Sequence, residues 1–418
     1  MRFSPYLFYA FYFAMYLPTS ISVNLGFMRL TPYRILLIVF FLANIPKFAQ
    51  QLRFRADNPG FFIIFCGIWS FFALWVNHDF ALGVETGGIN FIELAAPFFI
   101  VLTYVKSVRE LEKLVKVMMI SVASLLLISV PESVTGFNWF RTFTDAISGG
   151  HHVHIDPRLG LQRALATFDH PILNGVVSSS VIGFYYFCTR WWLTMLPVVA
   201  TATSLSSGAI ASILTQALLI GWERFIKTKK RWMLLAAIVF FIYIVAEMFS
   251  NRSGFMAILS VLVFSAHTAY NRYYIWIFGT QNVADNPFFG IGLNDWVRPE
   301  YMGSSVDNYW LVIMLRYGLP ALISYLIAIY LILKGLFKYR VKDKKLTAIR
   351  RGWLCGFAGL CVSAGTVHYW NAAYIYFNFY LGLGFAIVLI LRSAFKEEIE
   401  NSIKTRKKRY DLEGSTNA

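Results

Sequence analysis

The chain has 418 residues, of which 57% are apolar and only 14% are charged, and its mean hydropathy is +0.56. Soluble domains usually carry about 25% charged residues, so this composition excludes a soluble multidomain protein. The formal net charge of +16 could point to a nucleic-acid partner, but the basic residues form short clusters between long apolar runs. This pattern is typical of the cytoplasmic loops of membrane proteins, and we expect no nucleic-acid partner.

Apolar runs long enough to cross a membrane recur along the whole chain. A transmembrane helix needs about 20 mostly apolar residues. The sequence therefore predicts an all-α polytopic membrane protein with about 12 transmembrane helices, built as a single integral membrane domain over residues 1–418. The predicted spans are, in chain order, residues 5–23, 31–46, 60–77, 91–105, 115–133, 172–188, 191–207, 208–223, 232–249, 309–333, 352–369 and 374–391.

The distribution of lysine and arginine predicts how the chain is oriented. Most basic residues, including all 16 lysines, fall in five segments: 47–59, 106–116, 223–231, 334–351 and the tail 392–418. If both termini are cytoplasmic, the predicted spans put all five segments on the cytoplasmic side, as the positive-inside rule requires. We therefore predict a multi-pass membrane protein with both termini and the basic tail in the cytoplasm.

This topology leaves two long segments on the periplasmic face, residues 134–171 and 250–308. In the second, the apolar run 254–266 is only about 13 residues long, a length typical of re-entrant or interfacial helices. The cytoplasmic loops are short, and the chain has neither a Walker A motif nor a dinucleotide-binding glycine pattern. Long loops are commonly functional. Any chemistry is therefore expected in the two outer segments, without ATP or another cofactor.

The basic residues predicted to be outside or embedded are all arginines. They are Arg29, Arg34, Arg141, Arg158, Arg163, Arg252, Arg272, Arg298 and Arg316. The positive-inside rule explains why outer charges are few, but it does not explain why none is lysine. A guanidinium presents paired, planar donors that suit a phosphate group. We predict that at least two of these arginines bind phosphate, whereas Arg29 and Arg141 are expected to be solvated charges at the interface.

Three outer segments carry distinctive motifs: Leu161–Gly175 (LQRALATFDHPILNG), Asn286–Trp296 (NPFFGIGLNDW) and Ser305–Ala321 (SVDNYWLVIMLRYGLPA). Together they resemble the O-antigen ligase and polymerase family, whose members act on undecaprenyl-pyrophosphate-linked glycans. The resemblance covers residues from about 160 to 330, and the predicted layout of helices fits the rest. The matching positions are Arg163, Thr167, Phe168, His170, Pro171, Asn174, Asn286, Pro287, Gly290 and Gly292, with Ala166 where the family commonly has glycine.

The third motif departs from the ligase pattern. The ligases have a histidine, then Asn, Ser or Gln, then nine residues before a glycine. Asn308 and Gly318 keep this spacing, but Asp307 stands in place of the histidine. A Ser-Arg-Gly pattern of the family also reads Ser-Ser-Gly here, at residues 206–208. The resemblance therefore favours a polymerase over a ligase.

The resemblance implies a metal-independent glycosyltransferase that makes a bacterial surface polysaccharide by joining undecaprenyl-pyrophosphate-linked repeat units at the periplasmic face. The expected catalytic residues are Asp307, Arg163 and Arg272. The expected substrate-binding residues are Arg158, His170, Asn174, Arg252, Arg298 and Asn308. The arginines would stabilise the charge that grows on the pyrophosphate, and Asp307 would orient or deprotonate the attacking hydroxyl. The expected partners are the lipid-linked oligosaccharide, membrane lipid, a chain-length regulator and a flippase.

Other interpretations stay open. A ligase would transfer the glycan to lipid A-core, and a transporter would move it without catalysis. A transporter should show internal repeats or broken helices near mid-membrane, and no convincing repeat is visible in the sequence. Asp307 and Ser305 precede a predicted helix and could simply cap it, and His170 could be only a turn residue. The histidines at 151, 152 and 154 suit a solvated loop better than a metal site, while Gly290 and Gly292 suit tight turns.

Overall fold

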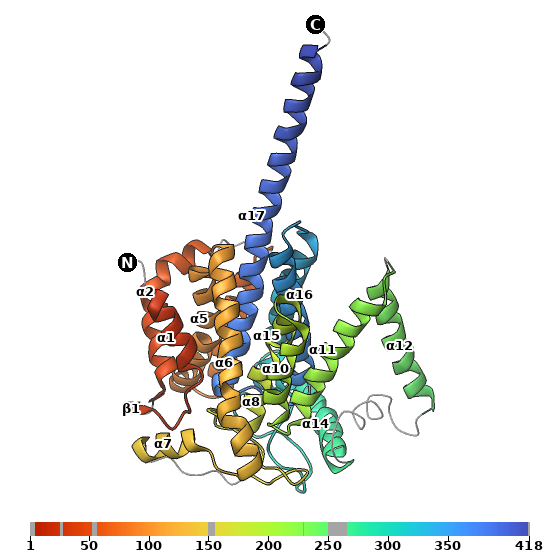
Figure 1. Cartoon of the computed structure of the whole chain (residues 1–418). Helices are drawn as coiled ribbons and strands as arrows, with labels where there is room; N and C mark the ends of the chain where they lie inside the picture. Colours follow the sequence, from red (N-terminus) through yellow and green to blue (C-terminus); the bar gives the residue numbers. More distant parts are fainter. Residues whose placement is uncertain are drawn as a thin grey trace.

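The computed structural model describes residues 5–25, 28–51, 57–148, 155–228, 230–249 and 266–416. Helices make up most of this part of the chain (Figure 1). The only sheet in the described residues is a hairpin of β1 (Val23–Leu25) and β2 (Met28–Leu30), which pair antiparallel. The predicted all-α membrane fold is thereby confirmed at the level of its class.

Most of the helices run roughly along one direction and form a bundle, from which α12 stands apart (Figure 1). The helices include α1 (Pro5–Ala14), α2 (Pro32–Gln51), α3 (Pro59–Asn77), α5 (Gly88–Tyr104), α6 (Val108–Thr135), α8 (Pro171–Ser179), α9 (Ile182–Cys188), α10 (Met195–Ala202), α11 (Ser207–Phe225), α12 (Arg231–Phe249), α15 (Tyr309–Lys338), α16 (Lys344–Ala364) and α17 (Asn371–Thr416). Short pieces complete the connections: α4 (Phe80–Leu82), a π-helix (Gly83–Gly87) and a 3₁₀ turn (Trp191–Thr194).

Within the described residues, seven helical segments are long and apolar enough to cross a membrane. They are Pro59–Asn77, Phe80–Tyr104, Val108–Thr135, Pro171–Cys188, Arg231–Met248, Tyr309–Lys338 and Asn371–Thr405. Each of the other predicted spans contains helix, but none is both long and apolar enough to qualify. The chain is thus a multi-pass helical protein, and the count of twelve spans stays a prediction.

The first predicted span, residues 5–23, is shorter than expected. Its helix α1 ends at Ala14, and the chain then turns towards the β-hairpin. Pro18 lies just beyond this end. Proline cannot donate a helical hydrogen bond and disfavours helix in the residue before it, so an apolar pattern alone overestimated this helix.

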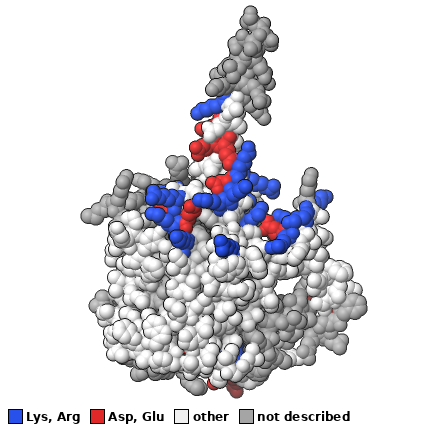
Figure 2. Space-filling model, viewed as in Figure 1, with Lys and Arg blue, Asp and Glu red and all other residues white. Residues whose placement is uncertain are grey.

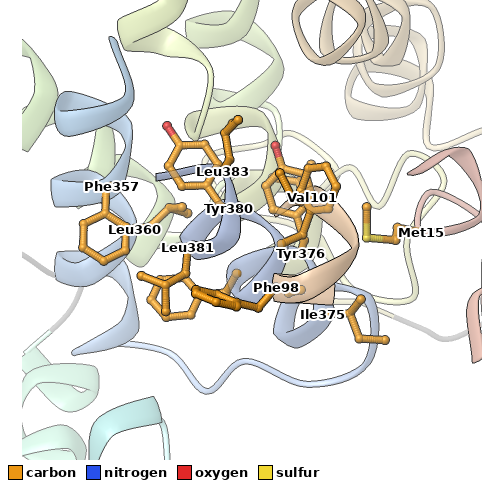
Figure 3. Close-up of a cluster of buried hydrophobic side chains, with 14 of the residues drawn as sticks. Met15, Phe98, Val101, Phe357, Leu360, Ile375, Tyr376, Tyr380, Leu381 and Leu383 are labelled. Atoms are coloured by element: carbon orange, nitrogen blue, oxygen red, sulfur yellow. The ribbon is translucent and has the colours of Figure 1, made fainter. Parts of the chain in front are cut away.

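The centre of the bundle is the first half of α17, which packs against α5 and α15. Figure 3 shows Tyr376, Tyr380 and Leu381 of α17 beside Phe98 of α5 and Leu360 of α16. The buried tyrosine hydroxyls have partners: Tyr376 shares a 2.7 Å hydrogen bond with the Ser180 hydroxyl, and Tyr380 donates to the Ser180 carbonyl at 3.0 Å. An aromatic core with satisfied hydroxyls fixes the register of α17 against its neighbours.

Basic residues gather at the end of the bundle from which the second half of α17 extends (Figures 1 and 2). This basic end contains the start of α6, the α11–α12 turn, the end of α15, the start of α16 and the Arg392 region of α17. Segments far apart in the sequence thus place their lysines at one level, as the charge pattern predicted. Its assignment to the cytoplasm stays a prediction.

The opposite end, which we call the site end, contains the two segments predicted to be periplasmic. The first holds a short helix, α7 (Trp139–Ser148), which lies across the direction of the bundle (Figure 1). Its Trp139, Phe143 and Ile147 are exposed, an apolar face typical of helices that lie in a membrane interface. In the second segment, α14 (Ala266–Asp285) packs against α15. The expected re-entrant run 254–266 lies outside the described residues except for Ala266, the first residue of α14.

Candidate functional site

The loop 155–170 docks onto the turn between α10 and α11. The Ala164 amide donates to the Thr203 carbonyl at 2.9 Å. Arg158 Nη1 donates to the Leu205 carbonyl at 3.0 Å, and Arg163 Nε lies 3.4 Å from the Ser204 carbonyl. A guanidinium has five N–H donors, so one hydrogen bond each leaves both arginines with further donor capacity. The docking brings both arginines beside the start of α11.

A buried carboxylate that the sequence analysis missed holds this loop. Glu132, near the end of α6, accepts from the Leu165 amide at 3.1 Å and the Ala166 amide at 2.8 Å. Ala166 has a φ of +53°, a left-handed conformation that costs about 1–2 kcal/mol for a residue with a Cβ atom. This conformation explains why glycine is common there in the family pattern. A lone acid at the end of an apolar run was the available signal for Glu132.

Arg141 is not the solvated interfacial charge that we expected. It is 8% exposed, and its Nη1 donates to the Phe168 carbonyl at 2.8 Å. Asp145, one turn along α7, lies 3.8 Å from its Nε. The expectation was wrong because α7 folds back onto the loop, which buries a side chain that an isolated segment would expose. Arg29 is exposed on the β-hairpin and donates to the Ser22 hydroxyl at 2.9 Å.

Arg272 reaches the same place from α14. Its Nη2 donates to the Ser207 hydroxyl at 2.9 Å, in the first turn of α11. Among the described residues, its buried Nε and Nη1 have no hydrogen-bond partner. Leaving a buried donor unpaired costs about 1–3 kcal/mol, and more for a charged group. The side chain is therefore set up to donate to a group that the described part of the chain does not provide.

Arg158, Arg163 and Arg272 form what we call the arginine cluster. Burial, together with the like charge of Arg158, lowers the pKa of Arg163 to about 10. Burial also lowers the pKa of Arg272; the charge of Asp307 opposes this shift and that of Arg158 adds to it. Among the described residues, no carboxylate lies within ion-pair distance of any of the three. Concentrated positive charge beside a helix N-terminus is an arrangement that binds anions.

His170 lies near enough to both the cluster and Asp307 to be affected by their charges. It is the N-cap of α8, and its Nδ1 accepts from the Ile172 amide at 3.2 Å, so the ring proton is on Nε2. Burial lowers the pKa of His170 to about 4, with the charge of Arg163 adding to the effect and that of Asp307 opposing it. The ring meets Trp370 edge to face, with centroids 5.5 Å apart. At neutral pH it is an uncharged donor.

The helix cap at the third motif is Asn308, not Asp307. The Asn308 side chain accepts from the Leu311 amide at 3.1 Å and caps α15. Asp307, half-buried, instead accepts a 2.9 Å hydrogen bond from the Ser305 hydroxyl. Its carboxylate is near enough to act electrostatically on both Arg272 and His170. Capping therefore does not account for Asp307, and it does account for Asn308.

The second motif is hydrogen-bonded to a break in α15. Gly318 has a φ of +79°, and Pro320 follows it. The Leu315 carbonyl accepts from the Ile291 amide at 2.7 Å, and the Leu319 amide donates to the Pro287 carbonyl at 2.8 Å. The break thus frees backbone groups that the docked loop satisfies.

The glycines at this junction allow the close approach. Gly290 has a φ of +63°, and a Cβ atom there would collide with the Leu315 carbonyl. A Cβ atom on Gly318 would collide with the Phe288 carbonyl. The prediction that Gly290 and Gly292 are turn formers is confirmed, since Gly292 also has a positive φ, of 65°.

A cavity of about 300 Å³ lies beside Asp307. Ser305, Trp296, Arg316 and His368 contribute to its lining. The Nδ1 of His368 is buried and has no hydrogen-bond partner among the described residues. His368 lies inside a predicted span, and nothing in the sequence distinguishes it from a residue that only packs against its neighbours. The cavity can accept a small polar group near Ser305, which donates to the Asp307 carboxylate.

The remaining predicted site residues are placed differently. Arg298 is engaged locally, with Nη1 2.6 Å from Asp295 Oδ1 and its guanidinium over the Trp296 ring. Asn174 is fully buried, and its amide donates to the Ala164 carbonyl at 3.1 Å, so it braces the docked loop. Arg252 and the histidines at 151, 152 and 154 lie outside the described residues. In the described ranges, no group of three or more His, Cys, Asp or Glu side chains could hold a metal ion.

Comparison with known families gives one match. Residues 192–326 match the family described as O-antigen ligase, which confirms the resemblance expected from the sequence. The matched segment contains α11, Arg272, Asp307 and the break at Gly318, whereas Arg163 and His170 lie before it. No curated protein matches the chain.

Proposed function

We propose that this member of the O-antigen ligase and polymerase family is a surface-polysaccharide polymerase that works at the periplasmic face of the inner membrane. It would transfer a growing glycan from undecaprenyl pyrophosphate to a sugar hydroxyl of another lipid-linked repeat unit. The observation that carries this proposal is the arginine cluster, which gathers three guanidinium groups without carboxylate partners in the described chain. Beside it lies a carboxylate, Asp307, that does not serve as a helix cap.

The arginine cluster would hold the pyrophosphate of the donor. The two unpaired nitrogens of Arg272 and the free donors of Arg163 supply charge-assisted hydrogen bonds, and the first turn of α11 adds its partial positive charge. As the bond between the anomeric carbon and the pyrophosphate oxygen breaks, negative charge grows on that oxygen. Fixed donors in a partly buried site stabilise this charge more than water does.

Asp307 would take the proton of the attacking hydroxyl. A new bond forms between the acceptor oxygen and the anomeric carbon, undecaprenyl pyrophosphate leaves, and the proton passes to the Asp307 carboxylate. General base catalysis of this kind typically contributes about 10²- to 10⁴-fold in rate. His170 is unsuited to this role because its Nδ1 accepts from the Ile172 amide and its Nε2 carries the ring proton. Its Nε2 proton would donate to substrate instead.

The acceptor sugar would bind in the cavity beside Asp307. Ser305 both lines the cavity and donates to Asp307, so a hydroxyl placed there lies close to the base. Arg316 and His368, whose Nδ1 has no partner in the described part of the chain, offer polar contacts.

Two other functions make different use of these features. The family description favours a ligase, which would use the same donor site but a lipid A-core acceptor. The break in α15 is a feature that transporters show, where unwound carbonyls coordinate ions. In this chain the carbonyls at the break are already used: Leu315 accepts from Ile291, and Trp69 donates to Tyr317 at 3.0 Å. The occupied carbonyls favour a structural break over a transport site.

Analysis of lipid-linked intermediates in a deletion strain separates the three functions. A polymerase mutant should accumulate single repeat units on undecaprenyl pyrophosphate in the periplasm. A ligase mutant should accumulate long chains on that lipid, and a transporter mutant should hold single units on the cytoplasmic side. Either of the last two results would replace the polymerase proposal.

A further inference from the structure

A second polar cavity lies at the basic end, on the other side of the bundle from the proposed active site. Its volume is about 500 Å³, and it is formed by the end of α15, the middle of α17 and the start of α3. None of the residues discussed for glycosyl transfer contributes to its lining. It therefore needs a separate explanation.

The lining has two distinct parts. Leu331, Phe385 and Val388 form an apolar wall between α15 and α17. Lys334, Lys338 and Arg392 provide three positive charges, all on exposed side chains. One acid, Asp57, also lines the cavity, so the lining carries a net positive charge of two. An apolar wall with a cationic rim matches a molecule that has a hydrocarbon part and an anionic head.

Several other basic residues at the basic end are paired with acids. Lys345 pairs with Glu112 at 3.5 Å, and Arg351 and Arg231 both pair with Glu223 at 3.4 and 3.1 Å. In the described chain, by contrast, Lys334, Lys338 and Arg392 have no carboxylate within ion-pair distance.

Two of these cations lie over aromatic rings. Lys334 lies over the Tyr330 ring at 5.9 Å and Lys338 over the Tyr339 ring at 5.5 Å. Such contacts orient an ammonium group but leave its N–H donors available for an anion.

We propose that this cavity binds one anionic phospholipid, with its phosphate among Lys334, Lys338 and Arg392 and an acyl chain along the apolar wall. Basic pockets between transmembrane helices at the membrane surface are suited to anionic headgroups. A free phosphate would use the cations but leave the apolar wall uncovered. The bound lipid would bridge α15 and α17 at the end opposite the catalytic groups.

Native mass spectrometry of the full-length protein in neutral detergent tests the proposal. The protein would be titrated with phosphatidylglycerol and, separately, with phosphatidylcholine of the same acyl chains. The test variant is Lys334→Gln/Lys338→Gln/Arg392→Gln. The control is Lys342→Gln/Lys396→Gln/Lys404→Gln, which loses the same charge from exposed lysines that do not line the cavity.

We expect wild type and control to bind one phosphatidylglycerol more tightly than phosphatidylcholine. Each basic residue near an anionic lipid typically strengthens binding about fivefold, so the test variant should bind about 100-fold more weakly. Equal affinity of the test and control variants, or equal binding of the two lipids, would overturn the proposal. So would full competition by glycerol phosphate, because that result assigns the cavity to a soluble phosphate.

A folding control keeps the result interpretable. The substituted side chains are exposed, so the test variant should unfold at nearly the same temperature as the control. If the triple variant does not fold, Lys338→Gln is compared with Lys338→Arg, which keeps the charge. Only the glutamine should then weaken binding of phosphatidylglycerol, and equal weakening by both would contradict the proposal.

Discussion

Replacement of Asp307 by asparagine separates catalysis from folding at the position on which the proposed mechanism depends most. The substitution keeps the shape of the side chain and an acceptor for the Ser305 hydroxyl, which lies 2.9 Å from the carboxylate. It leaves the α15 cap intact, because the Leu311 amide donates to Asn308. What it removes is the negative charge and the ability to take a proton.

The expected magnitudes are far apart. A substitution that touches no cap and no core contact usually changes stability by less than about 0.5 kcal/mol. Loss of a general base typically costs about 10²- to 10⁴-fold in rate. Asp307→Asn should therefore be folded and nearly inactive. Asn308→Ala provides the matched comparison, because loss of an N-cap costs typically about 1 kcal/mol of stability.

The assay measures polymer length and yield, normalised to the amount of protein in the membrane, together with the thermal unfolding midpoint of the purified variants. Asp307→His is the informative third variant, because the ligases carry histidine at this position. Partial activity from it would support a shared proton-accepting position. Normal polymer from Asp307→Asn at normal protein level would refute the reasoning and leave Asp307 without a catalytic role.

Three further substitutions test the cluster, the break and the histidine. Arg272→Lys keeps the charge but cannot reproduce the paired donors of a guanidinium group. The loss of one charge-assisted hydrogen bond predicts a transfer rate that is about 10- to 100-fold lower. Arg29→Lys, on the exposed hairpin, should keep normal activity in the same assay. Gly318→Ala should lower stability by about 1–3 kcal/mol, because the φ of +79° at this position suits only glycine. The control Gly221→Ala has open space around the added Cβ atom and should not lower the unfolding midpoint. The pKa of His170 is about 4 in the folded chain, whereas an unperturbed histidine has a pKa of 6.5. As the pH falls, the unfolded chain therefore binds the proton first, and the stability of the folded chain decreases between pH 6.5 and pH 4. His170→Asn keeps a capping side chain and should flatten that part of the stability profile, and an unchanged profile would count against the assignment.

Local sequence patterns predicted those features of the site that follow from which residue types occur in which segment. The arginines of two distant segments, at positions 163 and 272, meet at the start of α11, as a common phosphate site requires. Gly290 and Gly292 of the second motif have positive φ, as expected for glycines in tight turns. The distribution of charge along the sequence also predicted that basic residues gather at one end of the bundle.

Other features depended on tertiary contacts that no local rule specifies. Arg141 was misjudged because its burial follows from α7 packing on the loop that holds Phe168. The cap of α15 was misplaced by one residue, since Asp307 and Asn308 are both good capping types and only the backbone decides between them. Glu132 and His368 lie in apolar surroundings, where a polar residue gives no indication of which loop or cavity it will meet.

Reconstitution of the purified protein in liposomes, with a repeat unit linked to polyprenyl pyrophosphate as the sole substrate, tests the central claim most directly. Elongated lipid-linked chains and free polyprenyl pyrophosphate would be quantified together over time. The proposed mechanism predicts one molecule of polyprenyl pyrophosphate released for each repeat unit joined, without nucleotide, and neither product from Asp307→Asn. Movement of the substrate across the bilayer with no elongation and no released pyrophosphate would contradict it.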